Sequence, residues 1–406
     1  MGTRKRVLVL YADAGFGHRS AAKAIATALE EARGEDCEVT LANPLDDEKT
    51  PAWLREVQSD YDRVARELPQ LYKLSYDATD TGLARRLAEN ALRILLFRSM
   101  KALLERTRPD AIVSTYPLYQ APLGAVYAIE GRFVPTICVV TDLTAVHQLW
   151  FSHDADLTVV PTPTVRDLAL GAGVRPERIE EIGIPVHPRL SALAADKAAL
   201  RRSLGWREDL TTVLAVGSKR VGKLEAFLNV LNHSGLPLQL AIVAGGDERL
   251  FSSLSATEWH MPAKVYDYVA DMPAMMNAAD CLASKAGGLI VSESRAVGLP
   301  LLMIEAIPGQ ESGNAEYVVR GGAGDLALEP IRALETMRHW LLDDGALLRD
   351  RAARAAELGR PGAAREIAER AMAFALRGPV RREIAQLPGL GKLRDLLRRH
   401  GVSTDD

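Results

Sequence analysis

Apolar residues recur along the chain in short β-branched runs, and each run is followed by a stretch with helical spacing. In the first half the runs are RVLVLY, EVTLA, DAIVSTY, TICVVTD and LTVVPT. In the second half they are TTVLAVGS, QLAIVAG, KVYDYV, DCLASK and PLLMIE. Runs of this length, bounded by glycine, proline and aspartate and alternating with helices, are typical of parallel sheets built from βαβ units. The pattern therefore predicts an α/β protein.

The strand rhythm is interrupted between Pro188 and Asp209, where the sequence becomes charged and rich in alanine. A chain of 406 residues is also longer than one hydrophobic core usually supports. We therefore predict two Rossmann-like, doubly wound domains whose strands point their carboxyl ends toward a central cleft. The predicted organisation is an N-terminal domain over residues 1–190, a linker over 191–209 and a C-terminal domain over 210–374.

Charge is ordinary in amount but uneven along the chain. Charged residues make up 25% and apolar residues 48%, and the net charge of -3 argues against a bulk attraction to nucleic acid. Residues 83–108 and 377–400 each carry seven Lys or Arg side chains against two acidic ones, so the remainder is strongly acidic. This asymmetry points to an acidic surface as a partner.

The three cysteines, Cys37, Cys138 and Cys281, lie far apart and have no paired spacing. Such usage suits a reducing compartment and excludes a cysteine-based zinc site. The apolar run VLVLYA is shorter than the apolar region of a signal peptide, and no stretch approaches the length of a membrane span. We therefore expect a cytoplasmic protein with at most a peripheral attachment to a membrane.

The stretch VLVLYADAGFGHRSAAKAIATAL places Gly15 and Gly17 at a strand-to-helix turn before His18. Backbone amides at such a turn attract negative charge. Ser20 stands where a dinucleotide fingerprint has its third glycine, and no GK[ST] follows, so neither that fingerprint nor a Walker loop is present. Two interpretations stay open: glycines needed only for a tight turn, or a histidine held as a general base.

The stretch SKAGGLIVSESRAVGLPLLMIEAIPGQESGN, residues 284–314, carries a stronger signal. Gly287 and Gly288 follow a strand and open a helix that bears Glu293, and a second strand ends in a polar cluster. Helix amides suit the phosphates of a nucleoside diphosphate, a carboxylate suits ribose hydroxyls, and amide and carboxylate groups suit sugar hydroxyls. The stretch therefore predicts a site for a nucleoside diphosphate in the second domain.

This stretch, together with GFGHRSAAKAI, STYPLYQAP, VVTDLTAVHQLWFSHDADLTVVPT and GIPVHP, resembles the diacylglycerol glycosyltransferases. That group comprises the monogalactosyldiacylglycerol and processive diglucosyldiacylglycerol synthases, relatives of MurG. The resemblance implies a GT-B fold, a UDP-sugar donor held by the C-terminal domain and a lipid acceptor met by the N-terminal domain. It also implies inverting transfer without a metal or other cofactor, and a last segment, residues 375–406, that packs back on the N-terminal domain.

In the N-terminal domain the resemblance implies that His18 is the first choice and Asp142 the second for the base that takes the acceptor's proton. Asp142 has two other interpretations, a group that orients or charges the site and a simple strand-end cap. Gly17 and Trp150 are expected near the acceptor. For Trp150 the alternative is a buried aromatic residue beside a strand.

In the C-terminal domain the resemblance implies that Glu293 holds the ribose and that the backbone near Tyr268 and Val269 meets the uracil. The predicted donor-binding residues are Gly217, Ser218, Lys219, Tyr268, Val269, Lys285, Gly287, Gly288, Leu289, Glu293, Gln310, Glu311 and Asn314. The sequence departs from the family pattern at Asp13, which places a carboxylate beside the glycine loop of the other domain. It departs again in GSKRVGK, whose basic residues either clamp phosphate or form a solvated turn.

Residues 51–105 fit the family's membrane-docking region and end in the basic amphipathic stretch ILLFRSMKALLERTRP. Basic helices rich in leucine gain apolar burial and attraction to anionic lipid at an interface. The alternative is an ordinary amphipathic helix packed on its own sheet, and the C-terminal segment RGPVRREIAQLPGLGKLRDLLRRH leaves the same choice open.

These observations together predict an enzyme, a hexosyltransferase that moves glucose or galactose from UDP-glucose or UDP-galactose to diacylglycerol or a glycosyl-diacylglycerol. The expected location is the cytoplasmic face of the cell membrane, with an anionic membrane surface as partner and no nucleic acid or metal. One alternative is the same chemistry on a soluble or natural-product acceptor. An alternative of another class is a UDP-sugar-binding protein without transfer activity. The sequence does not separate glucose from galactose.

Overall fold

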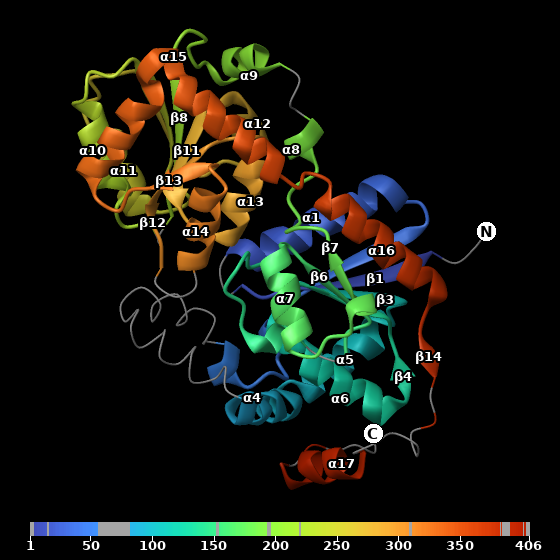
Figure 1. Ribbon diagram of the computed structural model, residues 1–406. Coiled ribbons are helices and arrows are strands. Elements are labelled where there is room, and N and C mark those ends of the chain that lie inside the picture. Colours follow the sequence, from blue (N-terminus) through green and yellow to red (C-terminus); the bar gives the residue numbers. More distant parts are fainter. Residues whose placement is uncertain are drawn as a thin grey trace. The chain divides into compact units, whose positions relative to one another are not determined.

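The computed structural model describes residues 4–13, 16–55, 82–151, 154–192, 196–218, 221–307, 311–381, 383, 390–400 and 402. The chain divides into two compact units. The first contains residues 1–185 and 363–406, and the second contains residues 186–362. Each unit has its own sheet with helices on both faces (Figure 1).

The first unit is built on a six-stranded parallel sheet with the order β2-β1-β3-β5-β6-β7. Its strands are β1 (Lys5–Leu10), β2 (Cys37–Ala42), β3 (Ala111–Ser114), β5 (Thr136–Val139), β6 (Leu157–Val160) and β7 (Ile179–Glu181). A separate antiparallel pair joins β4 (Arg132–Phe133) to β14 (Val380–Arg381). The parallel sheet confirms the fold class predicted for the first half of the chain.

The continuous apolar run of β1 reflects burial on both faces of the sheet. Val7 and Val9 belong to the apolar cluster on one face, whereas Leu8 and Leu10 belong to the cluster on the other. All four side chains are at most 1% exposed. A strand covered on both sides loses the polar alternation of a half-exposed strand, which is why these runs were recognisable.

Helices cover both faces of this sheet. The helices of the first unit are α1 (Phe16–Arg33), α4 (Gly82–Leu95), α5 (Phe97–Thr107), α6 (Gln120–Glu130), α7 (Pro163–Gly171), α16 (Ala363–Arg377) and α17 (Leu390–Arg399). Short 3₁₀ helices occupy Pro44–Asp46, Pro117–Tyr119, Gln148–Trp150 and Pro176–Arg178. Apolar residues of α1 and α16 share one cluster with β1 and β3, and residues of α5, α6 and α17 share the other.

The chain returns to the first unit earlier than the predicted residue 375. The return begins at Ala363, because α16 buries Ile367, Ala371 and their neighbours in the cluster formed with β1 and α1. An ion pair of 2.8 Å between Arg370 Nε and Glu180 Oε2 also joins α16 to β7. Residues 363–374, predicted in the second domain, therefore belong to the first unit.

The second unit has a six-stranded parallel sheet with the order β10-β9-β8-β11-β12-β13. Its strands are β8 (Thr211–Val216), β9 (Leu238–Val243), β10 (Ala263–Tyr266), β11 (Cys281–Lys285), β12 (Leu301–Glu305) and β13 (Gly324–Leu326). Its helices are α8 (Arg189–Ala192), α9 (Lys197–Leu204), α10 (Leu224–Asn232), α11 (Glu248–Ala256), α12 (Met272–Ala278), α13 (Gly288–Ala296), α14 (Ser312–Arg320) and α15 (Pro330–Leu358). The strand order is that of the doubly wound Rossmann fold.

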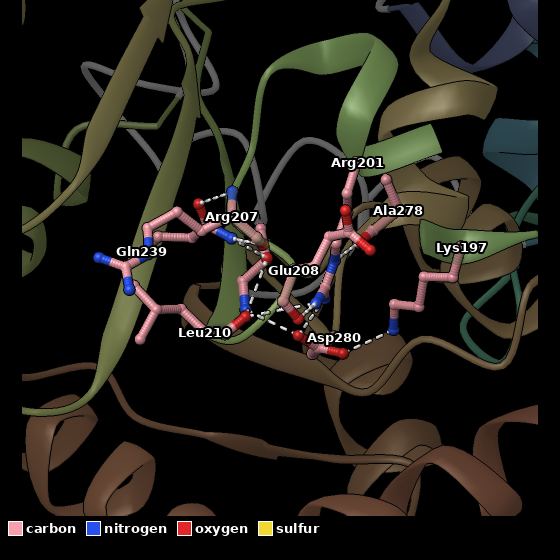
Figure 2. A network of polar contacts seen from close by, with 9 residues as sticks. Lys197, Arg201, Arg207, Glu208, Leu210, Gln239, Ala278 and Asp280 are labelled. Atoms are coloured by element: carbon pink, nitrogen blue, oxygen red, sulfur yellow. Dashed lines mark hydrogen bonds and ion pairs between the residues drawn. The ribbon is translucent and has the colours of Figure 1, made fainter. Parts of the chain in front are cut away.

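Residues predicted as a linker, 191–209, lie within the second unit. Helix α9 is tied to the sheet by a polar network around Asp280 and Arg201 (Figure 2). The guanidinium of Arg201 donates to the carbonyl of Ala278 at 2.9 Å and pairs with Asp280. Asp280 also accepts from the backbone N–H of Thr212, at the start of β8, at 2.7 Å. The charged composition taken for a linker therefore belongs to a helix held by its charges.

Both sheets have one point where the winding direction reverses. In the first unit the reversal lies between β1 and β3, and in the second it lies between β8 and β11. Loops at the carboxyl ends of the two strands diverge there, and doubly wound proteins bind ligands in the space left open. His18 follows β1, and Gly287 follows β11. Each of the two motifs singled out in the sequence therefore stands at a reversal point.

We predict that Asp280→Ala destabilises the second unit by about 3 kcal/mol, because a buried guanidinium loses its ionic partner. The Arg201 side chain is only 8% exposed. Urea unfolding followed by circular dichroism measures the change. Arg207→Ala removes an exposed ion pair with Asp209 and serves as the control, for which no measurable change is expected. Equal unfolding midpoints for the two variants would contradict the prediction.

Candidate functional site

His18 lies in the first turn of α1, at the reversal point of the first sheet. Its Nδ1 atom is 2.8 Å from the backbone oxygen of Thr115 and 3.0 Å from Oγ1 of Thr141. Thr115 directly follows β3, and Thr141 follows β5 by two positions. Three loops from neighbouring parallel strands thus meet at one imidazole ring. Sequence reasoning missed both threonines, although each stands at the end of a predicted strand run.

Two aromatic rings flank the imidazole of His18. The ring of Tyr116 packs edge-on at a centroid distance of 5.0 Å, and the ring of Trp150 lies tilted at 5.9 Å. Trp150 is 2% exposed, within the cluster that also contains Cys138 and Val160. This burial favours the second interpretation of Trp150, an aromatic residue packed beside a strand. Its indole supports the position of the His18 ring.

Asp142 and Asp13 are the two acidic residues of this region that the sequence singled out. Asp142 comes directly after Thr141 and is partly buried. Its assigned roles as second-choice base or orienting group stay predictions. Asp13 forms an ion pair with Arg19 of the same loop and helix, with 3.3 Å between Oδ1 and Nη1. The carboxylate of Asp13, which departs from the family's glycine motif, is therefore paired with the guanidinium of Arg19. Gly17 lies in the same helical turn as His18.

Gly217 follows β8, on the other side of the reversal point in the second sheet. A Cβ atom at Gly217 would lie 2.7 Å from Cδ2 of Leu224 and 2.8 Å from Cδ2 of Leu250. A side chain at this position would therefore displace methyl groups of α10 and α11, so the glycine keeps this packing close. Ser218 is partly buried beside it. Lys219, predicted with them, lies outside the described residues.

Gly287 and Gly288 open α13 directly after β11, as the sequence predicted. A Cβ atom at Gly287 would lie 3.3 Å from Nζ of Lys285 and 3.6 Å from Oε1 of Glu311. The ammonium group of Lys285 therefore stands at the amino end of α13, where backbone N–H groups already favour an anion. Leu289 is the second residue of the helix and is partly exposed.

Lys285 forms a buried ion pair with Glu311, whose side chain is only 5% exposed. The second carboxylate oxygen of Glu311 accepts from the backbone N–H of Ile307 at 3.0 Å. Asn314, 1% exposed, donates from Nδ2 to the carbonyl of Ala286 at 3.0 Å. Both predicted sugar-binding side chains therefore contact the protein, and they connect the segment after β12 to the segment after β11. Gln310 lies outside the described residues.

Glu293 lies on α13, two positions past the first turn, and is partly exposed. Within the described part of the chain, its carboxyl group has neither a hydrogen-bond partner nor an ion-pair partner. Desolvation by the surrounding protein raises the pKa of Glu293 to about 7. A poorly solvated carboxyl group without a partner, on the helix that follows Gly287, is arranged to accept hydrogen bonds from a ligand. This geometry is consistent with the predicted ribose contact.

Tyr268 and Val269 lie just after β10, at the same edge of the sheet. The side chain of Tyr268 is 74% exposed, and Val269 is partly buried. Their proposed contact was through the backbone, so this placement leaves the prediction open. Among the residues that the structure describes, no group of three or more His, Cys, Asp or Glu side chains is placed to hold a metal ion. Transfer without a metal stays a prediction.

The region proposed to meet lipid is described only in part, because residues 56–81 lie outside the described ranges. In α5, Phe97, Met100, Leu103 and Leu104 are buried against the sheet, which favours the interpretation of an ordinary amphipathic helix. The same cluster holds Leu397 of α17. Apolar exposure remains at Trp53, 55%, and at Leu87 of α4, 63%. None of the helices that the structure describes is long and apolar enough to cross a membrane.

We predict that Glu293→Gln stabilises the ligand-free protein at alkaline pH. The folded-state pKa is raised to about 7, so the native protein holds this proton more tightly than the unfolded chain does. The favourable contribution of this group to the free energy of unfolding is therefore fully present below about pH 4.5. It is lost as the pH rises toward 7 and above. The variant should match the wild type near pH 4 and exceed it by up to about 3 kcal/mol at pH 8. Urea unfolding at the two pH values measures this, and a pH-independent difference would contradict it.

Comparison with known proteins identifies relatives for both units. The family model of monogalactosyldiacylglycerol (MGDG) synthase matches residues 18–186. A probable chloroplastic monogalactosyldiacylglycerol synthase of Glycine max is 31% identical over 369 residues, which cover 88% of this chain and 69% of that protein. A probable synthase 2 of Oryza sativa subsp. indica is 30% identical over 374 residues, 89% of this chain and 79% of that protein.

Among solved structures, MurG of Acinetobacter baumannii superposes with a TM-score of 0.58 at 15% identity, covering 91% of this chain and 99% of the other. That likeness supports the GT-B fold. Both plant relatives are named as chloroplastic proteins, which contradicts the predicted cytoplasmic location at the cell membrane. Because the sequence identity extends over most of both chains, this protein belongs to the monogalactosyldiacylglycerol synthase family and is a hexose-transferring glycosyltransferase.

Proposed function

We propose that this protein transfers a hexose from a UDP-sugar to a hydroxyl group of diacylglycerol or of a glycosylated diacylglycerol, with inversion at the anomeric carbon. The observation that carries the proposal is the family relationship, which extends over 88% of the chain. Galactose is the expected sugar, because the relatives are named monogalactosyldiacylglycerol synthases. Glucose remains the alternative, since the two sugars differ only in the direction of one hydroxyl group.

In this proposal the UDP-sugar donor binds to the second unit. The amino end of α13 and the ammonium group of Lys285 offer positive charge to the diphosphate. Glu293, whose carboxyl group has no partner among the described residues, offers that group to the two ribose hydroxyls. Because these hydroxyls donate to a carboxylate, UDP favours the ionised form of Glu293 and lowers its pKa on binding. Glu311 and Asn314 fix the loops around this position, and Gln310 is left as a direct sugar contact.

The transfer step involves the acceptor oxygen, the anomeric carbon of the sugar and the proton of the acceptor hydroxyl. The acceptor oxygen forms a bond to the anomeric carbon from the face opposite the diphosphate, and the bond between that carbon and the phosphate oxygen breaks. The electron pair of the broken bond leaves with UDP. The acceptor's proton passes to His18 Nε2, which acts as general base. Histidine suits this step because its imidazole can hold or release a proton near physiological pH.

A lipid acceptor implies that the protein contacts a lipid surface. We propose that helices α4, α5 and α17 of the first unit make this contact. Their buried residues share one apolar cluster, so they cover the same face of the sheet. The outward side chains of α17 include Lys392, Arg398 and Arg399, all exposed. Trp53 and Leu87 of the same unit are exposed apolar residues. Such a combination favours an anionic lipid surface.

The decisive experiment is a donor screen. Wild-type protein is incubated with UDP-galactose or UDP-glucose and vesicles that contain diacylglycerol, and both released UDP and the lipid product are measured. Galactosyl-diacylglycerol is the expected product. UDP binding without turnover on any lipid would favour a UDP-sugar-binding protein without transfer activity. Turnover only on soluble acceptors would favour the natural-product alternative.

We predict that His18→Ala lowers kcat by about 10²-fold or more, because the acceptor's proton loses its base. The affinity for UDP should stay the same, since the donor contacts lie on α13 and its neighbours. Steady-state kinetics and calorimetric titration with UDP measure the two quantities. His400→Ala, at an exposed position of the same unit, is the matched control with no expected loss. Weakened UDP binding with normal turnover at saturation would refute the role of His18 as base.

We predict that replacing Lys392, Arg398 and Arg399 by alanine weakens binding to anionic vesicles by about 1 kcal/mol per residue. Sedimentation with phosphatidylglycerol-containing vesicles measures the bound fraction, which high salt should also reduce. Alanine at Arg202, Arg320 and Arg332 removes the same charge from the second unit and is the matched control. If both triple variants sediment like the wild type, α17 has no part in lipid binding.

A further inference from the structure

The position of His18 Nδ1 determines which tautomer the ring adopts. Nδ1 lies 2.8 Å from the backbone oxygen of Thr115, and a carbonyl oxygen only accepts hydrogen bonds. An unprotonated Nδ1 at this distance would place two lone pairs against each other. In the neutral ring the proton therefore resides on Nδ1, and Nε2 carries the lone pair. This is the tautomer in which Nε2 can take a proton from an acceptor.

The hydroxyl of Thr141 lies on the same side of the ring, with Oγ1 3.0 Å from Nδ1. Because the Nδ1 proton points toward the Thr115 carbonyl, Oγ1 serves as a second acceptor for the same N–H group. Thr141 is 7% exposed, so this contact is sheltered from water, which would otherwise compete for the N–H group. Two neutral oxygens, from two different loops, thus surround one ring nitrogen.

The two threonines are themselves fixed in place. The N–H of Thr115 donates to Leu10 of β1 at 2.9 Å, and its hydroxyl lies 2.9 Å from the carbonyl of His18. This ties the end of β3 to both the end of β1 and the first turn of α1. Thr141 follows β5, which is paired in register with β3. The sheet therefore sets the position of the Thr115 backbone oxygen and of the Thr141 backbone, which brings the Thr141 hydroxyl within reach of the ring.

We propose that Thr141 is a positioning residue of the transfer reaction, which together with the Thr115 carbonyl holds His18 in the Nδ1–H tautomer and in one ring orientation. The inference rests on the proposed role of His18 as base. When Nε2 takes the acceptor's proton, the ring becomes cationic, and its Nδ1–H bonds to both oxygens become stronger. Thr141 thus stabilises the protonated ring and keeps Nε2 directed at its target.

Thr141→Val tests this proposal, because valine keeps the branched shape and removes only the hydroxyl. The expected result is a kcat about 10-fold lower with an unchanged KM for the UDP-sugar. The acidic limb of the pH dependence of kcat/KM should also move to lower pH, because the imidazolium loses one acceptor. Thr141→Ser keeps the hydroxyl and should restore both values toward wild type.

Thr158→Val is the matched control. Thr158 is a buried threonine on the neighbouring strand β6, and its hydroxyl has no hydrogen-bond partner among the described residues. Its replacement should leave kcat and the pH profile unchanged. A Thr141→Val variant that folds like the Thr158→Val control and has wild-type kcat and pH profile, while His18→Ala is inactive, would overturn the proposal and leave the proposed function intact.

A second measurement needs no substrate, so it separates the two hypotheses. Multiple-bond ¹⁵N–¹H spectra of histidine-labelled protein report which ring nitrogen carries the proton, and the signal of His18 is assigned by its loss in His18→Gln. Wild-type protein at alkaline pH should show Nδ1–H alone, and Thr141→Val should show a detectable share of Nε2–H. A wild-type ring protonated on Nε2 overturns the proposal whatever the variants do. Absence of turnover by the wild type, with the Nδ1–H tautomer present, would count against the proposed function only.

Discussion

Parallel pairing at two reversal points is the constraint on which the rest of the molecule depends. In a parallel sheet every strand delivers its carboxyl end to the same edge, so β1, β3 and β5 bring three loops together, and β8 and β11 bring two. The candidate residues gather at these edges because of the register of the backbone. Short loops then need to supply only one or two side chains each. His18 meets Thr115 and Thr141 in this way, although the two threonines lie 97 and 123 positions after it along the chain.

Two carboxyl groups near α13 illustrate opposite uses of burial. Glu311 is almost fully enclosed, yet Lys285 and the N–H of Ile307 satisfy it, so it joins the loops after β11 and β12. Glu293 has no such partner in the described residues, and desolvation raises its pKa to about 7. The first arrangement gives a rigid support. The second leaves a group whose charge costs free energy until a ligand supplies donors.

The sequence predicted what depends on local pattern and missed what depends on tertiary contacts. All ten strand runs became strands. Central strands such as β1 and β9 are buried on both faces, which gives long apolar stretches, whereas the edge strands β2 and β10 are only partly buried. Edge strands β7 and β13, each three residues long, carry no such signal. The segment 191–209 has the charged composition of a solvated linker, which is what the sequence predicted, but Arg201 is buried against Asp280. Thr141 stands within the stretch VVTDLTAVHQLWF, but its contact with His18 depends on the pairing of β5 with β3.

The first unit is assembled from two separate pieces of the chain, and this affects the order in which the two units can complete their folding during synthesis. Helix α16 begins at Ala363, so ribosomal synthesis delivers it only after the entire second unit. Until then the face of the first sheet that carries Val7 and Val9 lacks one of its covering helices. The second unit, continuous in sequence, has all of its residues available sooner. The first unit is therefore the first to be synthesised and the last to be completed. Until α16 is made, the uncovered face of its sheet is the surface that chaperones would have to protect in the nascent chain.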